Sequence, residues 1–95
     1  MIKILDFWSP TCGYCKQLAP ALVEFAERNQ HAVEPISINT AIQKNRHLLN
    51  EYEVKKVPTL ILVKYGREVA RSQGLQPPTV DAIKRWVAAY EDTVR

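Results

Sequence analysis

The sequence predicts an α/β fold, a three-layer α/β/α arrangement around a four-stranded mixed sheet with the element order β-α-β-α-β-β-α. Three observations predict it. Short apolar runs alternate with segments of helical periodicity in the first half of the chain, a glycine turn joins two strand-like segments in the second half, and the chain ends on another helical pattern. With 95 residues, 46% of them hydrophobic, we expect residues 1–95 to form a single domain.

The first half of the chain contains two strand-like and two helix-like segments. Residues 2–8 are nearly all apolar, as expected for a strand buried on both faces. Apolar residues recur at helical spacing between residues 12 and 29 and predict an amphipathic helix entered directly from that strand. Residues 33–38 predict a second strand, parallel to the first through a right-handed crossover. Residues 39–52, which begin with an Asn and a Thr suited to the N-cap, predict a second helix.

The second half of the chain predicts a hairpin and a last helix. Residues 59–64 and 68–73 flank a turn at residues 65–67 and read as antiparallel strands. Two consecutive prolines at 77 and 78 then interrupt regular structure. The apolar stripe of residues 80–90 predicts the final helix.

Composition and charge exclude several classes of protein. The 13 basic and 10 acidic residues give a net charge of +3 and are spread along the chain, so no nucleic-acid partner is expected. No stretch approaches the roughly 20 apolar residues that span a bilayer, so no membrane association is expected. The apolar run at the start is interrupted by Lys3 and Asp6 and does not resemble a secretory signal. We therefore expect a cytoplasmic protein, in a compartment that keeps thiols reduced.

The chain has two cysteines, and they are close together in Cys12-Gly13-Tyr14-Cys15. Cys12 falls where the first strand ends and a helix begins, a position at which unpaired backbone N–H groups and the helix dipole favour a thiolate. Cys15 is one turn further along, close enough to form a disulfide. Closing a loop of four residues removes little conformational entropy from the unfolded chain, so the disulfide should stabilise the fold little and exchange readily with other thiols. We predict Cys12 to be the exposed attacking thiolate and Cys15 the buried resolving thiol.

Two other uses of the cysteine pair are weighed against redox chemistry. A zinc site would need further ligands, and His31 and His47 have no finger-like spacing to the cysteines. A purely structural disulfide over four residues would stabilise the fold little. We therefore favour a redox-active disulfide that works without metal or bound cofactor.

Matches at widely separated points resemble the thioredoxin family, in which a Cys-x-x-Cys pair follows the central strand. The matching segments are Asp6-Phe7-Trp8, Lys16, Ala19-Pro20, Val57-Pro58-Thr59, Lys64-Tyr65-Gly66 and Gly74. The resemblance covers nearly the whole chain, and it lacks only the first strand and helix that thioredoxins usually carry. It implies a thioredoxin-like fold and a thiol–disulfide oxidoreductase that acts on protein disulfides, with a separate reductase or glutathione as electron donor. We expect the protein to act as a monomer.

Asp6 is the candidate proton-transfer residue. It shares its strand face with apolar neighbours, so burial is expected and would raise its pKa. The resemblance implies that it helps move the proton of Cys15, whereas the alternative is an Asp turned to solvent near the strand end. Thioredoxins often place a lysine near this aspartate from the neighbouring strand, and Pro35 occupies that position here.

The candidate substrate-binding residues are implied by the resemblance too. An X-Pro bond is the common place for a cis peptide, and the backbone of Val57, before Pro58, would pair with an extended substrate. An ordinary proline at a strand start is the alternative. Trp8 would support the cysteine loop, Gly74 would close the last strand, and Tyr14 would project between the cysteines toward substrate or simply pack as an ordinary ring.

Departures from the family pattern leave alternative functions open. Thr11 and Tyr14 replace the Trp and Pro usual in thioredoxins, which predicts a less strongly reducing pair. One alternative is a partner-binding module that uses the surface around Trp8, Val57 and Gly74. The other is a glutathione-coupled, glutaredoxin-like enzyme, although the glycine pair that helps hold glutathione is missing from residues 72–75.

Overall fold

The computed structural model describes residues 2–90, so the ends of the predicted domain, residues 1 and 91–95, lie outside the described residues. The described elements are β1 (Ile2–Trp8), α1 (Gly13–Arg28), β2 (Val33–Asn39), the 3-10 turn η1 (Gln43–Asn45), α2 (Arg46–Glu51), β3 (Thr59–Lys64), β4 (Arg67–Ser72) and α3 (Val80–Ala88). They follow the predicted order, and the predicted α/β fold is confirmed.

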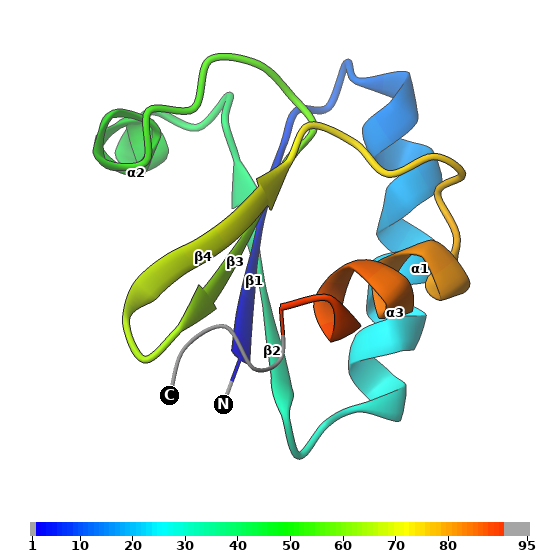
Figure 1. Ribbon diagram of the computed structural model, residues 1–95. Coiled ribbons are helices and arrows are strands. Elements are labelled where there is room, and N and C mark those ends of the chain that lie inside the picture. Colours follow the sequence, from blue (N-terminus) through cyan, green and yellow to red (C-terminus); the bar gives the residue numbers. More distant parts are fainter. Residues whose placement is uncertain (1, 91–95) are drawn as a thin grey trace.

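The four strands form one mixed sheet in the order β2-β1-β3-β4. β1 is parallel to β2 and antiparallel to β3, and β4 is antiparallel to β3. The parallel pair is joined through α1, which packs beside β2 (Figure 1). This order places β1 in the interior of the sheet, so that its carboxyl end, where the cysteine motif begins, is fixed on both sides.

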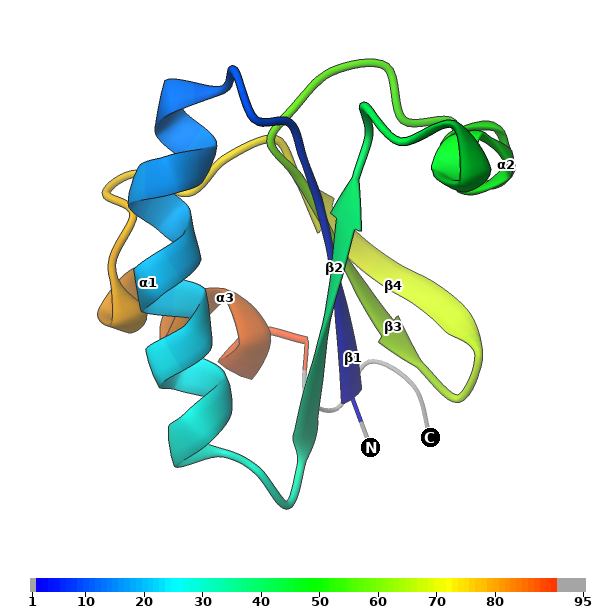
Figure 2. The same ribbon diagram turned by 180° about the vertical axis from the view of Figure 1, so that it is seen from behind.

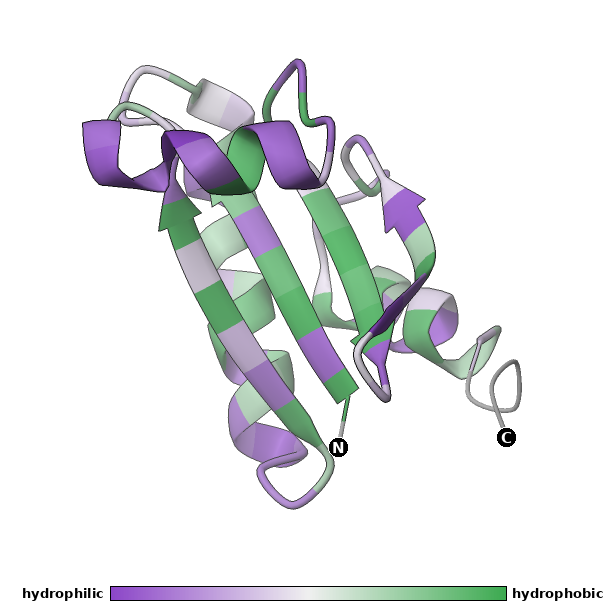
Figure 3. Ribbon diagram, turned by 90° about the vertical axis from the view of Figure 1, so that its left-hand side faces the viewer, coloured by the Kyte–Doolittle hydropathy of each residue, from purple (hydrophilic) through white to green (hydrophobic). Residues whose placement is uncertain are grey.

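Helices cover the two faces of the sheet unequally. α1 and α3 lie on one face and the short α2 lies near the other, as Figures 1 and 2 show from opposite sides. Ile4 packs in the cluster under α1 and α3, whereas Leu5 and Phe7 pack in the cluster on the α2 side. β1 is therefore buried on both faces, which explains its nearly continuous apolar sequence. In Figure 3 β1 and β3 carry most of the hydrophobic colour of the sheet.

The β3–β4 hairpin turns on two residues with positive φ. Tyr65 has φ 53° and Gly66 has φ 75°, the pattern of a type I′ turn, which matches the twist of the strands on either side. Lys64 pairs directly with Arg67. The hairpin is as predicted, except that β4 begins and ends one residue earlier than the expected range 68–73.

The second helix is shorter than predicted. Residues 39–52 were expected to form one helix, but the chain turns at residues 40–42, passes through η1 and becomes α-helical only over Arg46–Glu51. The Asn39 side chain accepts a hydrogen bond from the Ala41 N–H at 2.9 Å, so it caps a local turn instead of a helix. Ile42 is extended (φ −88°, ψ 125°), and this interrupts the helix.

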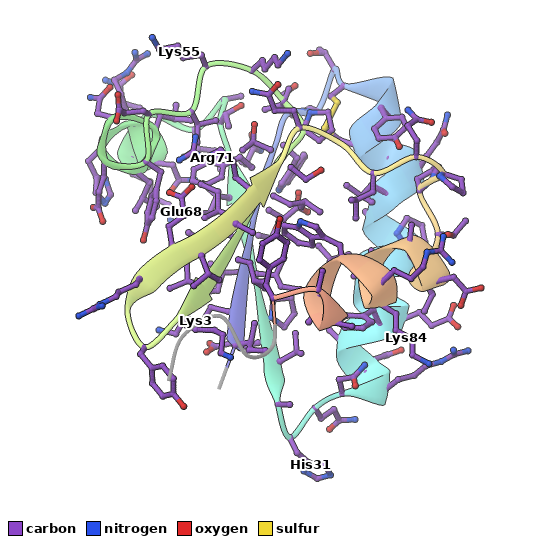
Figure 4. All side chains as sticks on the ribbon, in the orientation of Figure 1. Lys3, His31, Lys55, Glu68, Arg71 and Lys84 are labelled. Atoms are coloured by element: carbon purple, nitrogen blue, oxygen red, sulfur yellow. A yellow bond between two sulfur atoms is a disulfide. The ribbon has the colours of Figure 1, made fainter. Side chains whose placement is uncertain are left out.

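Arg71 ties the edge strand β4 to the end of α2. Its guanidinium donates to both carboxylate oxygens of Glu68, at 2.7 and 2.9 Å, and to the Tyr52 carbonyl at 2.7 Å. Glu68 and Arg71 are labelled side by side in Figure 4. The hydrogen bond from Arg71 lowers the pKa of Glu68. The contact holds the segment that leads into the Val57 loop.

Candidate active site

The cysteine motif occupies the junction between β1 and α1. Cys12 is the N-cap of α1, with extended backbone (φ −88°, ψ 107°), and its Sγ accepts a hydrogen bond from the Cys15 N–H at 3.1 Å. The Cys12 N–H in turn donates to the Ser9 carbonyl at 3.1 Å. Cysteine sulfur thus takes the position that a Ser or Asp side chain holds at an ordinary N-cap, where negative charge is favoured.

Cys12 and Cys15 form a disulfide, with their Cα atoms 5.3 Å apart. Cys12 is partly exposed, whereas Cys15 is only 5% exposed. The two sulfurs therefore differ in access to a partner: an incoming thiol or disulfide meets Cys12 first.

Asp6 lies behind the disulfide on the α1 side of β1. It is half-buried and lines a pocket of about 200 Å³ together with Trp8, Cys15, Lys16 and other residues of α1 and β2. Burial raises the pKa of Asp6 to about 6 from its ordinary value of 3.8. A carboxyl with this proton affinity exchanges a proton near neutral pH.

Ser37 is a site residue that the sequence reasoning missed. The Trp8 indole donates to its Oγ at 2.7 Å, and Ser37 lines the same pocket as Asp6 and Cys15. The parallel register pairs Asp6 with Ser37. The sequence contains part of this information. When the two predicted strands are aligned in parallel, Ser37 of the second lies opposite Asp6, the acidic residue of the first.

The Val57–Pro58 segment closes the other side of the site. The peptide bond between these residues is cis, and Pro58 is buried. Thr59, 2% exposed, donates from its hydroxyl to the Lys56 carbonyl at 2.6 Å and so ties the loop to the start of β3. Val57 is partly exposed, so its backbone is near the surface beside the cysteine loop.

Tyr14 packs against the opposite loop. Its Cε2 atom lies 3.1 Å from the position that a Cβ on Gly74 would take, and Pro58 Cγ lies 3.6 Å from that same position. The Tyr14 hydroxyl is buried and has no hydrogen-bond partner among the described residues. The ring is thus held against the loop after β4, and the structure brings Tyr14, Pro58 and Gly74 together.

Replacing Gly74 by alanine is expected to destabilise the protein by about 1–3 kcal/mol. Gly74 has φ +120°, which L side chains rarely adopt, and the new methyl group would press on the Tyr14 ring. Gly13→Ala is the matched control, because a Cβ there meets nothing within 4 Å. Urea denaturation measures both. A cost for Gly74→Ala no larger than that for Gly13→Ala would contradict the steric role of the contact.

The histidines lie away from this site. His31 and His47 are exposed, and Figure 4 shows His31 at the turn between α1 and β2, at the far end of α1 from the cysteine motif. Within residues 2–90, no cluster of three or more His, Cys, Asp or Glu side chains could hold a metal ion. No helix in that range is long and apolar enough to cross a membrane.

The disulfide lies at the N-terminus of a helix that follows an interior strand of a mixed sheet, and the half-buried Asp6 carboxyl lies behind it. This arrangement is typical of proteins that catalyse thiol–disulfide exchange. The family model described as Thioredoxin matches residues 1–89. The chain therefore belongs to the thioredoxin family, as its sequence resemblance predicted.

Curated relatives and solved structures agree with this membership. The thioredoxin of Alicyclobacillus acidocaldarius is 38% identical over 74 residues, and that of Haemophilus influenzae is 38% identical over 76 residues. These matches cover 78% and 80% of this chain and 69% of each relative. The germline-specific thioredoxin Deadhead of Drosophila melanogaster superposes with a TM-score of 0.79 at 22% identity, over 93% of this chain and 79% of its own. A malarial protein superposes with a TM-score of 0.81 at 18% identity, over 94% and 96% of the two chains.

Family membership and the Cys12–Cys15 pair together identify the protein as a protein-disulfide oxidoreductase. Thioredoxins act on protein disulfides, receive electrons from a reductase and need no prosthetic cofactor.

Proposed function

We propose that the protein reduces or exchanges protein disulfides with Cys12 as the nucleophile and Cys15 as the resolving thiol. The observation that carries this assignment is the difference in access between the two sulfurs, since Cys12 is partly exposed at the helix N-terminus and Cys15 is buried behind it. A thiolate at Cys12 is stabilised by the N-terminal backbone N–H groups of α1.

The reaction proceeds through a mixed disulfide. In the reduced protein the Cys12 thiolate attacks one sulfur of the substrate disulfide, forms a bond from Cys12 Sγ to that sulfur and releases the other as a thiolate. Cys15 then attacks Cys12 Sγ, the second substrate thiolate leaves, and the Cys12–Cys15 disulfide remains. Two electrons pass to the substrate, and the protein ends in the oxidised state.

Asp6 is proposed as the base for the second step. Cys15 must lose its proton before it can attack, and Asp6 lines the pocket that Cys15 also borders. A carboxylate whose pKa is about 6 can accept that proton and release it later to water. The pocket between them is wide enough for a water to bridge the two groups.

The surface around Cys12 is proposed to bind an extended segment of the substrate. The backbone of Val57 pairs with that segment, so recognition depends on main-chain hydrogen bonds more than on side chains. Pro58, which follows Val57, is buried, and Gly74, which has no side chain, leaves room for the Tyr14 ring on the opposite side. Trp8 anchors the cysteine loop to β2, while the Tyr14 ring packs against the loop at Gly74 and borders the proposed binding surface there.

We also propose that the protein acts as a monomer in the cytoplasm, without nucleic-acid or membrane partners. Both cysteines of the chain belong to the exchange pair, as expected where thiols are kept reduced. Large apolar side chains exposed within residues 2–90 are Val23, Ile42 and Tyr65, which lie on α1, the segment before η1 and the hairpin turn. They are on separate elements and do not form one contiguous patch.

Turnover of a model protein disulfide tests the proposed electron source. With a thioredoxin reductase as donor, we expect catalytic reduction of the disulfide, and with glutathione as donor much slower turnover. Faster turnover with glutathione would indicate a glutaredoxin-like enzyme. No turnover with either donor, in protein shown to carry two free thiols, would contradict the oxidoreductase reading and favour a partner-binding module.

A further inference from the structure

Asp6 lines two hollows between α1 and β2. The ribbons of α1 and β2 lie beside each other in Figure 2. The first hollow, of about 200 Å³, reaches Trp8 and Cys15, and the second, of about 190 Å³, reaches Pro35. Asp6, Ala19 and Ser37 line both hollows. Apart from Asp6 itself, Ser37 is therefore the one polar residue within residues 2–90 that lines both of these hollows.

Ser37 faces Asp6 across the sheet. The two residues are paired in the parallel register of β1 and β2, and adjacent strands lie about 4.8 Å apart. Ser37 is exposed while Asp6 is half-buried. Ser37 is therefore the more solvent-accessible member of this cross-strand pair.

The Trp8 indole determines whether the Ser37 hydroxyl donates or accepts in the hydrogen bond between them. An indole N–H can only donate, so at 2.7 Å the Ser37 Oγ must be the acceptor. The hydroxyl proton of Ser37 is then free for another acceptor. No other hydrogen-bond partner of this hydroxyl is present among residues 2–90, so its proton is available to a water in the hollows that Ser37 shares with Asp6.

The Asp6 carboxyl lacks a protein donor of its own. Within the described part of the chain it has neither a side-chain hydrogen bond nor an ion pair, and burial alone raises its pKa. From α1 the titratable groups at the hollow are Cys15 and Lys16, β2 contributes the Ser37 hydroxyl, and the residue paired from β3 is the apolar Leu60. A hydrogen bond to the carboxylate is therefore left to water, and Ser37 is the hydroxyl that lines both hollows beside Asp6.

We propose that Ser37 is a positioning residue for proton transfer: held by the Trp8 indole, its hydroxyl orients the water that hydrogen-bonds to Asp6 and carries the proton of Cys15 on to solvent. The proton leaves Cys15 Sγ, resides on a carboxylate oxygen of Asp6 and then passes to water in the hollow. Ser37 keeps its own proton, and no electrons move in these transfers. The inference rests on the base role proposed for Asp6.

Infrared titration of the Asp6 carboxyl in the oxidised protein tests the positioning directly. Asp6→Asn identifies the signal. Ser37→Ala is expected to raise the titration midpoint by roughly half a pH unit or more, because a donor that stabilises the charged form is lost. Ser37→Thr keeps the hydroxyl and should leave the midpoint near that of the unmodified protein. An unchanged or lowered midpoint in Ser37→Ala, or an equal rise in Ser37→Thr, would overturn the inference.

Ser9→Ala is the matched control. Ser9 lies in the cysteine loop and its hydroxyl contacts Thr11, but it borders neither of the hollows that contain Asp6. Its removal should not move the midpoint. A rise as large as that of Ser37→Ala would show a general effect of losing a hydroxyl near the site, and would count against Ser37.

A kinetic measurement separates this inference from the proposed role of Asp6. A mixed disulfide is formed on Cys12 with a coloured aromatic thiol, and its release by Cys15 is followed by stopped-flow absorbance across pH. We expect the inflection of the release rate to move upward in Ser37→Ala, and Ser37→Ala to change the rate less than about twofold in an Asp6→Asn background. An infrared shift without a kinetic shift would overturn the proton-transfer role of Asp6 and this inference with it. No infrared shift would overturn the inference alone.

Discussion

Cys15→Ala is expected to accumulate a stable mixed disulfide between Cys12 and its protein substrate, whereas Cys12→Ala is expected to lose disulfide reduction by at least about a thousandfold. The first variant keeps the exposed sulfur at the helix N-terminus but lacks the thiol that would release the substrate. The second keeps only a sulfur that is 5% exposed. A buried thiol reaches neither the substrate nor the stabilising N-terminal N–H groups.

The two variants are matched controls for each other, since each loses one sulfur at the same junction. Non-reducing gel electrophoresis and intact mass measure the trapped adduct after incubation with a model protein disulfide. Reductase-coupled turnover measures what activity remains. Equal trapping by both variants would contradict the assigned roles, and more trapping through Cys15 would reverse them.

Much of the fold could be predicted because the secondary structure that each local sequence pattern favours is the one that tertiary packing also favours. Residues 2–8 carry the continuous apolar pattern of a strand covered on both faces, and the structure places Ile4 and Leu5 in opposite clusters. The Cys12 position could be predicted because a strand end followed directly by helical periodicity leaves a single place for the helix N-terminus. The turn at Tyr65-Gly66-Arg67 between two strand-like segments predicted the hairpin, and in the structure Tyr65 and Gly66 adopt the positive φ that such a turn requires.

The parts that could not be predicted depend on contacts distant in sequence. Asn39 is a good N-cap residue, but its side chain satisfies the Ala41 N–H in a turn and the helix starts later. Ser37 is recognised as a site residue through its hydrogen bond with the Trp8 indole, 29 residues away in the sequence. For Tyr14 the sequence left open whether the ring projects toward substrate or packs as an ordinary ring, and its contact with the loop at Gly74 joins segments distant along the chain. Hydrophobic periodicity in a single sequence does not identify such pairings; only the parallel alignment of the two predicted strands brings Ser37 opposite Asp6.

Asp6→Asn is expected to stabilise the oxidised protein by about 2–3 kcal/mol at pH 7 to 8. Burial raises the pKa of Asp6 to about 6, against 3.8 for an ordinary aspartate, so the unfolded chain ionises at lower pH than the folded protein. The contribution of Asp6 to the free energy of unfolding is fully present below about pH 3.8 and is lost as the pH rises through about 6. The asparagine amide has no charge to desolvate, so the gain in the free energy of unfolding from Asp6→Asn should vanish near pH 4, where the Asp6 carboxyl is itself neutral in the folded protein. Urea denaturation across pH measures it.

Stability and activity should move in opposite directions in this variant, which separates the proton-transfer role from a packing defect. A misfolded Asp6→Asn protein would be both less stable and less active, whereas loss of a buried base gives a more stable protein that resolves its mixed disulfide slowly. Glu34→Gln removes an exposed carboxylate from β2 and should change the free energy of unfolding by less than about 0.5 kcal/mol. A gain for Asp6→Asn that is independent of pH, or equal to that of Glu34→Gln, would show that Asp6 does not ionise in the buried setting described here. The proton-acceptor role proposed for Asp6 accounts for a carboxylate that lowers the stability of the fold at neutral pH, since burial is what raises its pKa toward that pH.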